Sequence, residues 1–249
     1  MKLKNNYFAK HPLVAVFLFT FICLLPEMLM RDFTPSNELR YLSIADEALR
    51  DGHFFAFFNH GLAYADKPPL YIWLVMLCKV LFGTHSSLAL SMLSVVPAFV
   101  IVWLMDRWVM SNAKATDRMA MAMLLLTSIM FLGTMAVIRM DMLMCMFIVM
   151  AMFTFWRMYE LDSDGLEDPR NAAVYKKCSR LLPVWIFMAL FTKGPVGLLV
   201  PPLSIIVFLA VKRKWRDIGK YLGWKTWGVI AGLSIVWFSC VYIDGGKSY

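Results

Sequence analysis

Three short stretches of this sequence place a carboxylate close to a cation. A cationic side chain can hold a lipid phosphate, and a carboxylate can deprotonate an incoming nucleophile. Together they suit a transfer reaction whose donor is an anionic lipid. Charges at the ends of membrane helices also pair for structural reasons, and spacing alone favours that simpler interpretation. The pairs are Glu38 with Arg40, Asp66 with Lys67, and Arg139 with Asp141.

The composition indicates that the chain is an integral membrane protein. Of the 249 residues, 60% are hydrophobic and 17% are charged, whereas soluble domains carry about a quarter charged residues. The net charge of +8 comes from basic residues in short segments between apolar runs, where it sets membrane topology rather than nucleic-acid binding. The five cysteines, which form no CxxC pair, are interpreted as small hydrophobic residues. They are Cys23, Cys78, Cys145, Cys178 and Cys240.

The apolar runs predict an all-α integral membrane fold. A run of about 20 residues suits a spanning helix. The first run exceeds a signal-peptide core and is followed by no cleavage site, so we expect it to be retained. The predicted spans cover residues 12–30, 87–108, 118–138, 142–159, 181–211 and 224–242.

Charge decides two ambiguous segments. Residues 69–82 are too few to span easily, and we expect them to lie flat on the outer surface. The links 1–11, 106–118, 157–180 and 212–225 then share one side and hold 17 of the 25 basic residues, so that side is predicted to be cytoplasmic.

The long run 181–211 divides into two spans at Lys193-Gly194-Pro195, because Gly and Pro break a helix there. About seven spans result, with the N-terminus inside and Tyr249 outside. The chain is expected to form a single transmembrane module over residues 1–249.

One sizeable outer loop, residues 31–86, carries the charged pairs. An amphipathic helix is predicted over residues 36–51, ended by Gly52, and it suits the membrane surface. The aromatic stretch 54–58 is expected at the headgroups.

Four motifs of the chain resemble, in the same order, those of the lipid-carrier-dependent glycosyltransferases of the GT-C superfamily. The nearest group is that of lipid A aminoarabinose transferase, with protein O-mannosyltransferases more distant. The family pattern Asp-Glu-x-Arg-Tyr corresponds to residues 37–41, and Tyr-x-Glu-Lys-Pro-Pro corresponds to residues 64–69. The second-loop Asp corresponds to Asp141, and Thr-Lys-Gly to residues 192–194.

The resemblance implies a membrane glycosyltransferase. Its relatives move a sugar from a polyprenyl phosphate to a lipid A-like lipid or a protein, generally with inversion at the anomeric carbon. The reaction takes place on the outer, periplasmic face of the inner membrane. No cofactor is required; family members can carry a divalent metal near acidic loop residues, here Asp66, but no ligand set in this sequence demands one.

The resemblance also suggests roles for single residues. Arg40, Lys67 and Lys193 would hold the donor phosphate. The remaining substrate contacts would come from Tyr41, Tyr64, Asp66 and Arg139.

The family's catalytic aspartate corresponds to Asn37, and an amide cannot act as a base. Glu38 and Asp141 are therefore the predicted catalytic carboxylates, although adjacent helical residues such as Asn37 and Glu38 point about 100° apart. The family also runs to more than twice this length, so the chain is expected to be the N-terminal part of a longer protein.

Two alternatives stay open at this stage. Asn37 and the short length fit a protein that binds polyprenyl phosphate without catalysis, or a degenerate or truncated enzyme. A small-molecule transporter ranks last, because its spans should carry polar groups near mid-membrane and these are almost free of them.

Overall fold

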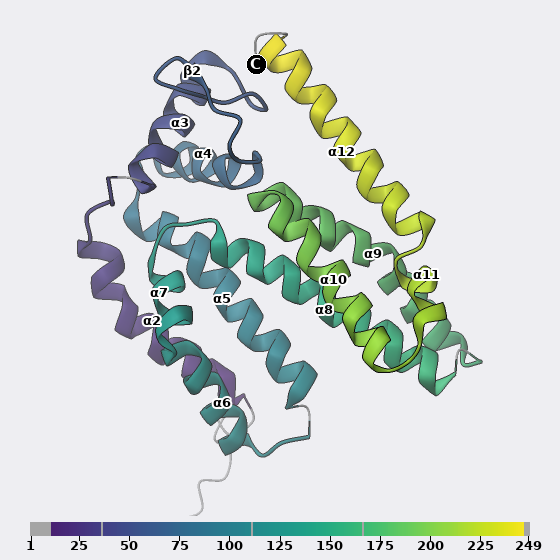
Figure 1. Cartoon of the computed structure of the whole chain (residues 1–249). Helices are drawn as coiled ribbons and strands as arrows, with labels where there is room; N and C mark the ends of the chain where they lie inside the picture. The colour runs from purple at the N-terminus through teal and green to yellow at the C-terminus, as the bar shows by residue number, and fades with distance from the viewer. Residues whose placement is uncertain (1–10, 36, 111, 166, 247–249) are drawn as a thin grey trace, which may run out of the picture.

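The computed structural model is mostly helical and describes residues 11–35, 37–110, 112–165 and 167–246 (Figure 1). The basic segment 1–10 and the predicted helix start at Ser36 lie outside the described residues. The elements are α2 (Pro12–Met30), α3 (Glu38–Asp51), β1 (Phe58–Asn59), β2 (Leu62–Ala63), α4 (Leu70–Phe82), α5 (Ser87–Val109), α6 (Ala115–Thr127), α7 (Ile129–Ala136), α8 (Asp141–Asp164), α9 (Pro169–Lys193), α10 (Pro195–Val211), the 3-10 turn η1 (Trp215–Asp217), α11 (Ile218–Tyr221) and α12 (Trp224–Gly245).

The predicted helical membrane fold is confirmed. The β-structure of the described part is one short hairpin, in which the two-residue strands β1 and β2 pair antiparallel. Among the residues that the structure describes, four helices are long and apolar enough to cross a membrane, namely α2, α5, α8 and α12. The bent pair α6 and α7 makes a fifth if it counts as one span. The count of seven stays a prediction, because α10 is shorter and α9 begins with a polar half.

The region 118–138, expected as one span, is bent by 66° between α6 and α7. Thr127 donates its hydroxyl to the Met123 carbonyl at 2.7 Å, and Ser128 donates to Leu125 at 3.0 Å. Hydroxyls that bond to the preceding turn compete with the helix and favour a bend. The backbone at Ser128 is accordingly extended, with ψ 133°.

The predicted break in 181–211 is confirmed, since α9 ends at Lys193 and α10 begins at Pro195. Gly194 adopts φ 101°, a conformation that glycine takes without strain. At Gly197, an added Cβ would lie 2.2 Å from the Ala189 carbonyl oxygen. The two helices therefore approach closely just where Lys193 leaves α9.

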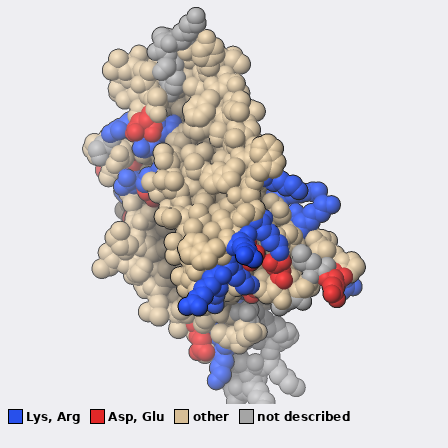
Figure 2. All heavy atoms as spheres, turned by 45° about the vertical axis from the view of Figure 1, so that its right-hand side comes forward, with Lys and Arg blue, Asp and Glu red and all other residues tan. Residues whose placement is uncertain are grey.

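The molecule has two chemically different ends (Figure 1). At one, which we call the loop end, lie α3, α4 and the hairpin. The other, the basic end, holds the links 106–118, 157–180 and 212–225. Figure 2 shows a large group of Lys and Arg side chains below the middle of one face. This separation is the one that the charge pattern predicts, while the orientation in a membrane stays a prediction.

Helix α4 lies across the loop end rather than alongside the long helices (Figure 1). It buries Tyr71, Ile72 and Val75 in a core shared with α3 and α8, while Val80 and Leu81 are exposed. Its one-sided burial fixes α3 above the start of α8, and the charged residues of the loop end depend on that placement.

Candidate functional site

Glu38, at the first turn of α3, has a completely buried carboxylate. It accepts hydrogen bonds from Arg31 at 2.6 Å, from the Thr34 amide at 2.8 Å and from the Ile138 amide at 2.8 Å. Burial by itself would raise the pKa of Glu38, but these donors outweigh it and hold the pKa below 4.5. The carboxylate thus joins the connection before α3 to the segment before α8.

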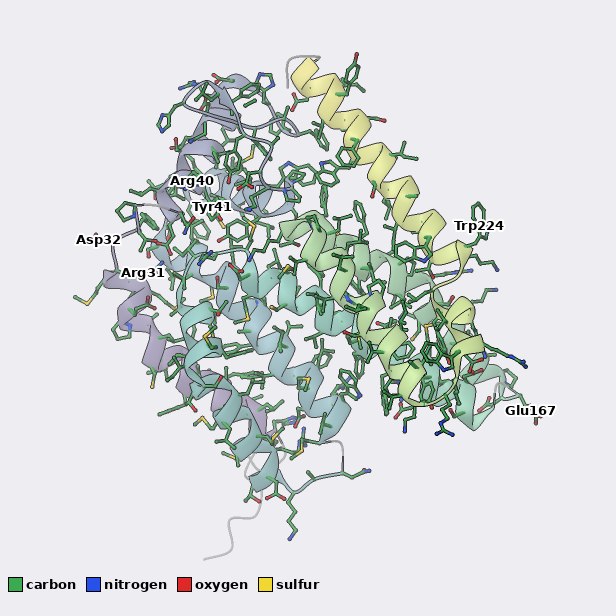
Figure 3. All side chains as sticks on the ribbon, viewed as in Figure 1. Arg31, Asp32, Arg40, Tyr41, Glu167 and Trp224 are labelled. Atoms are coloured by element: carbon green, nitrogen blue, oxygen red, sulfur yellow. The ribbon has the colours of Figure 1, made fainter. Side chains whose placement is uncertain are left out.

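The expected pairing of Glu38 with Arg40 does not occur. Residues two apart on a helix lie on different faces, so Glu38 points inward to Arg31 while Arg40 is exposed. Asn37 directly precedes α3 and makes no capping hydrogen bond with its side chain. Figure 3 shows Arg31 in the connection and Arg40 on α3, both at the loop end.

Tyr64 connects two of the predicted donor-site residues. Its hydroxyl hydrogen-bonds with the side chains of Arg40 and Asp66. Burial and the Asp66 charge raise the pKa of Tyr64, and Arg40 opposes them. Asp66 in turn lies 3.1 Å from the Lys67 ammonium. The motif 64–69 therefore presents a neutral hydroxyl between charges of both signs.

Asp141 is the first residue of α8, where the helix dipole favours a negative charge. The Lys193 ammonium donates a hydrogen bond to its Oδ1 atom, and Arg139 lies 3.3 Å from its Oδ2 atom. The Asp141 side chain keeps 22% of its surface exposed. Unlike Glu38, this carboxylate is held by two long, flexible side chains.

Tyr41, on α3, is 5% exposed. Its ring packs edge-on against Tyr71 with 5.5 Å between centroids. Burial raises the pKa of Tyr41 to about 12, with Tyr64 adding and Arg139 opposing. Its hydroxyl is therefore a neutral hydrogen-bonding group at any ordinary pH.

The structure thus gathers eight of the ten predicted site residues at the loop end in two linked sets, one around Tyr64 and one around Asp141, and the pKa of Tyr41 responds to charges of both; together we call them the charged cluster. Asn37 and Glu38 stand apart from it, at the start of α3. The cluster holds four cations against two carboxylates, an excess of two positive charges that suits a phosphate. Its members are Arg40, Tyr41, Tyr64, Asp66, Lys67, Arg139, Asp141 and Lys193.

Sequence reasoning missed Asp244, near the end of α12. Its carboxylate accepts hydrogen bonds from the amides of Phe55 at 2.6 Å and Ala56 at 2.9 Å, and lies 3.1 Å from His53. The contact ties the outer loop to a helix 188 or more residues away in sequence. The sequence around Asp244 contains no local pattern that predicts this contact.

The residues around Asp66 do not fit a metal site. Among the described residues, no three side chains of His, Cys, Asp or Glu come together as ligands would. Asp66 itself is 60% exposed and engages Lys67.

Comparison with known proteins finds several curated relatives that carry the same transferase name. The chain is 29% identical to undecaprenyl phosphate-alpha-4-amino-4-deoxy-L-arabinose arabinosyl transferase 2 of Sodalis glossinidius, over 77% of this chain and 33% of the relative. It is 28% identical to the corresponding transferase of Shewanella sediminis, over 89% of this chain and 38% of that one. The chain therefore spans about a third of the length of these curated relatives. No protein-family model matches it.

The crystal structure of ArnT from Cupriavidus metallidurans bound to undecaprenyl phosphate matches with a TM-score of 0.78 at 19% identity. The match covers 95% of this chain and 42% of that one. The chain shares the fold of the matched part of that ArnT. The apo form of the same ArnT matches with a TM-score of 0.71. The resemblance to aminoarabinose transferases expected from the four motifs is thereby confirmed.

Proposed function

We propose that this chain forms the donor-binding part of a membrane glycosyltransferase. The enzyme would take a sugar from a polyprenyl-phosphate carrier and transfer it to a lipid A-like lipid or to a protein. We place the reaction on the outer, periplasmic face of the inner membrane, at the loop end. The observation that carries the proposal is the charged cluster, whose positive excess suits a lipid phosphate. The names of the relatives support the same donor class.

In this proposal the phosphate of the donor binds Arg40, Lys67 and Lys193. These cations come from three separate elements, so they can approach one phosphate from different sides. They also stabilise the negative charge that builds up on the leaving phosphate. The hydroxyls of Tyr41 and Tyr64 are neutral, as their raised pKa values require, and can hydrogen-bond the sugar. Asp66 and Arg139 complete the contacts with the substrate.

Asp141 is the carboxylate that we assign as general base. It would accept the proton of the acceptor hydroxyl while the hydroxyl oxygen bonds to the anomeric carbon. The bond from that carbon to the phosphate oxygen breaks, and its electron pair leaves with the polyprenyl phosphate. A donor phosphate that binds Lys193 competes for the cation that now holds Asp141. Donor binding would therefore free the base at the moment when it is needed.

Glu38 stays a predicted catalytic residue, but its geometry supports a positioning role. Three donors already occupy its buried oxygens. Oε1 already accepts from Arg31 and Ile138 and Oε2 from Thr34, so the one lone pair left to take a proton is the second of Oε2, in a buried place.

The test compares two arginines of the same helix. Arg40 belongs to the charged cluster, whereas Arg50 is exposed and paired with Asp51. We expect Arg40→Ala to weaken binding of radiolabelled undecaprenyl-phosphate sugar about tenfold, with Arg50→Ala as the unaffected control. Lys67→Ala should act like Arg40→Ala. Wild-type donor binding by both cluster variants would refute the phosphate assignment.

A binding protein without catalysis is the second candidate, favoured by Asn37 and by the buried, hydrogen-bonded Glu38. A protein of this kind would bind the donor saturably but would transfer its sugar to none of the acceptors offered. Transfer that Asp141→Asn abolishes while donor binding persists would exclude this candidate.

A further inference from the structure

A second charged site lies at the basic end, away from the charged cluster. It is an open pocket of about 820 Å³ between α5, α8 and α9, where α8 packs against both other helices. Its wall combines cations with large aromatic rings. The residues that the argument uses are Asp106, Arg107, Trp108, Arg118, Trp156 and Lys177.

The acids that line this pocket are already neutralised. Asp106 binds Arg118 through two hydrogen bonds of 2.7 and 2.5 Å, and Glu160 lies 3.2 Å from Arg157. The lining has four cations and two acids, so two positive charges are left over. An anion can enter without displacing either ion pair.

Arg107 and Lys177 supply this excess. Neither forms an ion pair with an acidic side chain within the described part of the chain. The Arg107 guanidinium lies over the Trp103 ring, 4.5 Å from its centroid, so the side chain borders both this pocket and the neighbouring cavity that Trp103 lines. Lys177, one helix away on α9, completes the pair.

An apolar groove of about 580 Å³ adjoins the pocket. Trp108 and Trp156 line both cavities, and their rings lie 6.0 Å apart. Apart from Ser204, the rest of the groove is apolar: Met152, Phe155, Leu203, Val207 and Phe208. A cationic pocket and an apolar groove thus meet at a tryptophan wall, and tryptophan favours the depth where lipid headgroups meet acyl chains.

We propose that this pair of cavities binds one anionic phospholipid, with its phosphate at Arg107 and Lys177 and an acyl chain in the apolar groove. Basic pockets between membrane helices recognise such headgroups. The groove distinguishes a lipid from free phosphate, because inorganic phosphate has nothing to place there. This site is independent of the sugar donor and of the proposed transfer.

Native mass spectrometry of the detergent-purified protein tests the proposal with phosphatidylglycerol and phosphatidylcholine of identical acyl chains. We expect one phosphatidylglycerol to remain bound where phosphatidylcholine does not. Lys177→Ala should weaken its binding about fivefold, and Arg107→Ala should do the same. Lys177→Arg keeps the charge and should restore binding.

Lys176→Ala is the matched control, since Lys176 neighbours Lys177 on the same helix, is also exposed and does not line the pocket. Equal losses in Lys176→Ala and Lys177→Ala would show general surface attraction and overturn the site. Equal retention of both lipids would overturn it as well. Displacement of the lipid by millimolar inorganic phosphate would show a phosphate site and overturn the role of the groove.

Discussion

Glu38 and Asp141 are two carboxylates at the same end of the molecule, held in opposite ways. Glu38 is fully buried, and hydrogen bonds from two backbone amides and from the Arg31 guanidinium hold its carboxylate. Asp141 is held by the long side chains of Lys193 and Arg139 and keeps partial contact with solvent. Backbone donors cannot leave without unfolding the segment, whereas side-chain cations can exchange partners.

The difference teaches that a charged motif residue is best judged by what holds it. A buried carboxylate that accepts hydrogen bonds from backbone amides maintains the fold, because leaving those amides unpaired is costly. A carboxylate held by mobile cations can be released by a competing anion. Of the two predicted catalytic acids, we therefore propose Asp141 for chemistry and Glu38 for position.

The largest expected effect separates their roles in catalysis. Asp141→Asn should lower sugar transfer about a hundredfold or more, because the amide cannot accept the proton. Asp162 is a close match, 21% exposed and bonded to Lys220 at the basic end, so Asp162→Asn should transfer normally. Transfer rates with saturating donor measure both. Full activity in Asp141→Asn would remove it from the mechanism.

Stability should show the reverse order. Glu38→Gln breaks a buried ion pair with Arg31 and should cost about 3 kcal/mol of unfolding free energy. Glu47→Gln is the control on the same helix, where the carboxylate accepts the His60 and Gly61 amides in an exposed setting. Thermal unfolding in detergent compares the two. Equal melting temperatures would mean that burial of Glu38 contributes little.

The contribution of Glu38 to the free energy of unfolding should be lost only at low pH. Its folded pKa lies below the ordinary value of 4.5, so its stabilisation is present above pH 4.5 and is lost as the pH falls through the lower folded pKa. The difference in melting temperature between wild type and Glu38→Gln should therefore hold from neutral pH to about 4.5 and shrink below it. A difference that already vanishes at pH 6 would contradict the hydrogen-bonded carboxylate.

The smallest effect concerns Tyr71, a buried residue of α4. Its buried hydroxyl has no hydrogen-bond partner among the described residues, so Tyr71→Phe should raise stability slightly, by up to about 1 kcal/mol. Tyr221→Phe is the contrast, because that hydroxyl lies 3.2 Å from Asp162 and its loss should destabilise. If Tyr71→Phe instead lowers transfer at unchanged stability, its hydroxyl serves a substrate.

Local signals made part of this structure predictable. Gly52 ends α3 in the left-handed conformation, and the Gly-Pro pair after Lys193 ends α9, both as the sequence indicates. The bend at Ser128 escaped prediction, because the apolar run continues through it and a single hydroxyl is a weak signal. In such a run, length and hydropathy identify a membrane segment without giving its shape.

The site divides in the same way. Motif order correctly indicated that these motif residues lie near one another at the loop end, while their roles stay predictions. The partners of Glu38 were not predictable, because the Ile138 amide lies 100 residues away and its approach depends on how α3 packs over α8. Spacing identifies residue types that can react, and only packing decides which of them are free to do so.

The tie between Asp244 and the outer loop has a mechanical consequence. Helix α12 packs mainly on α9 and leaves most of its length uncovered, and its 22 residues extend about 33 Å. That is close to the thickness of a bilayer core, and a thinner bilayer makes such a helix tilt. Because the carboxylate at its tip holds the Phe55 and Ala56 amides, tilting pulls on the loop that carries Tyr64 and Lys67. Membrane thickness is thereby expected to act on the proposed donor site through the Asp244 side chain.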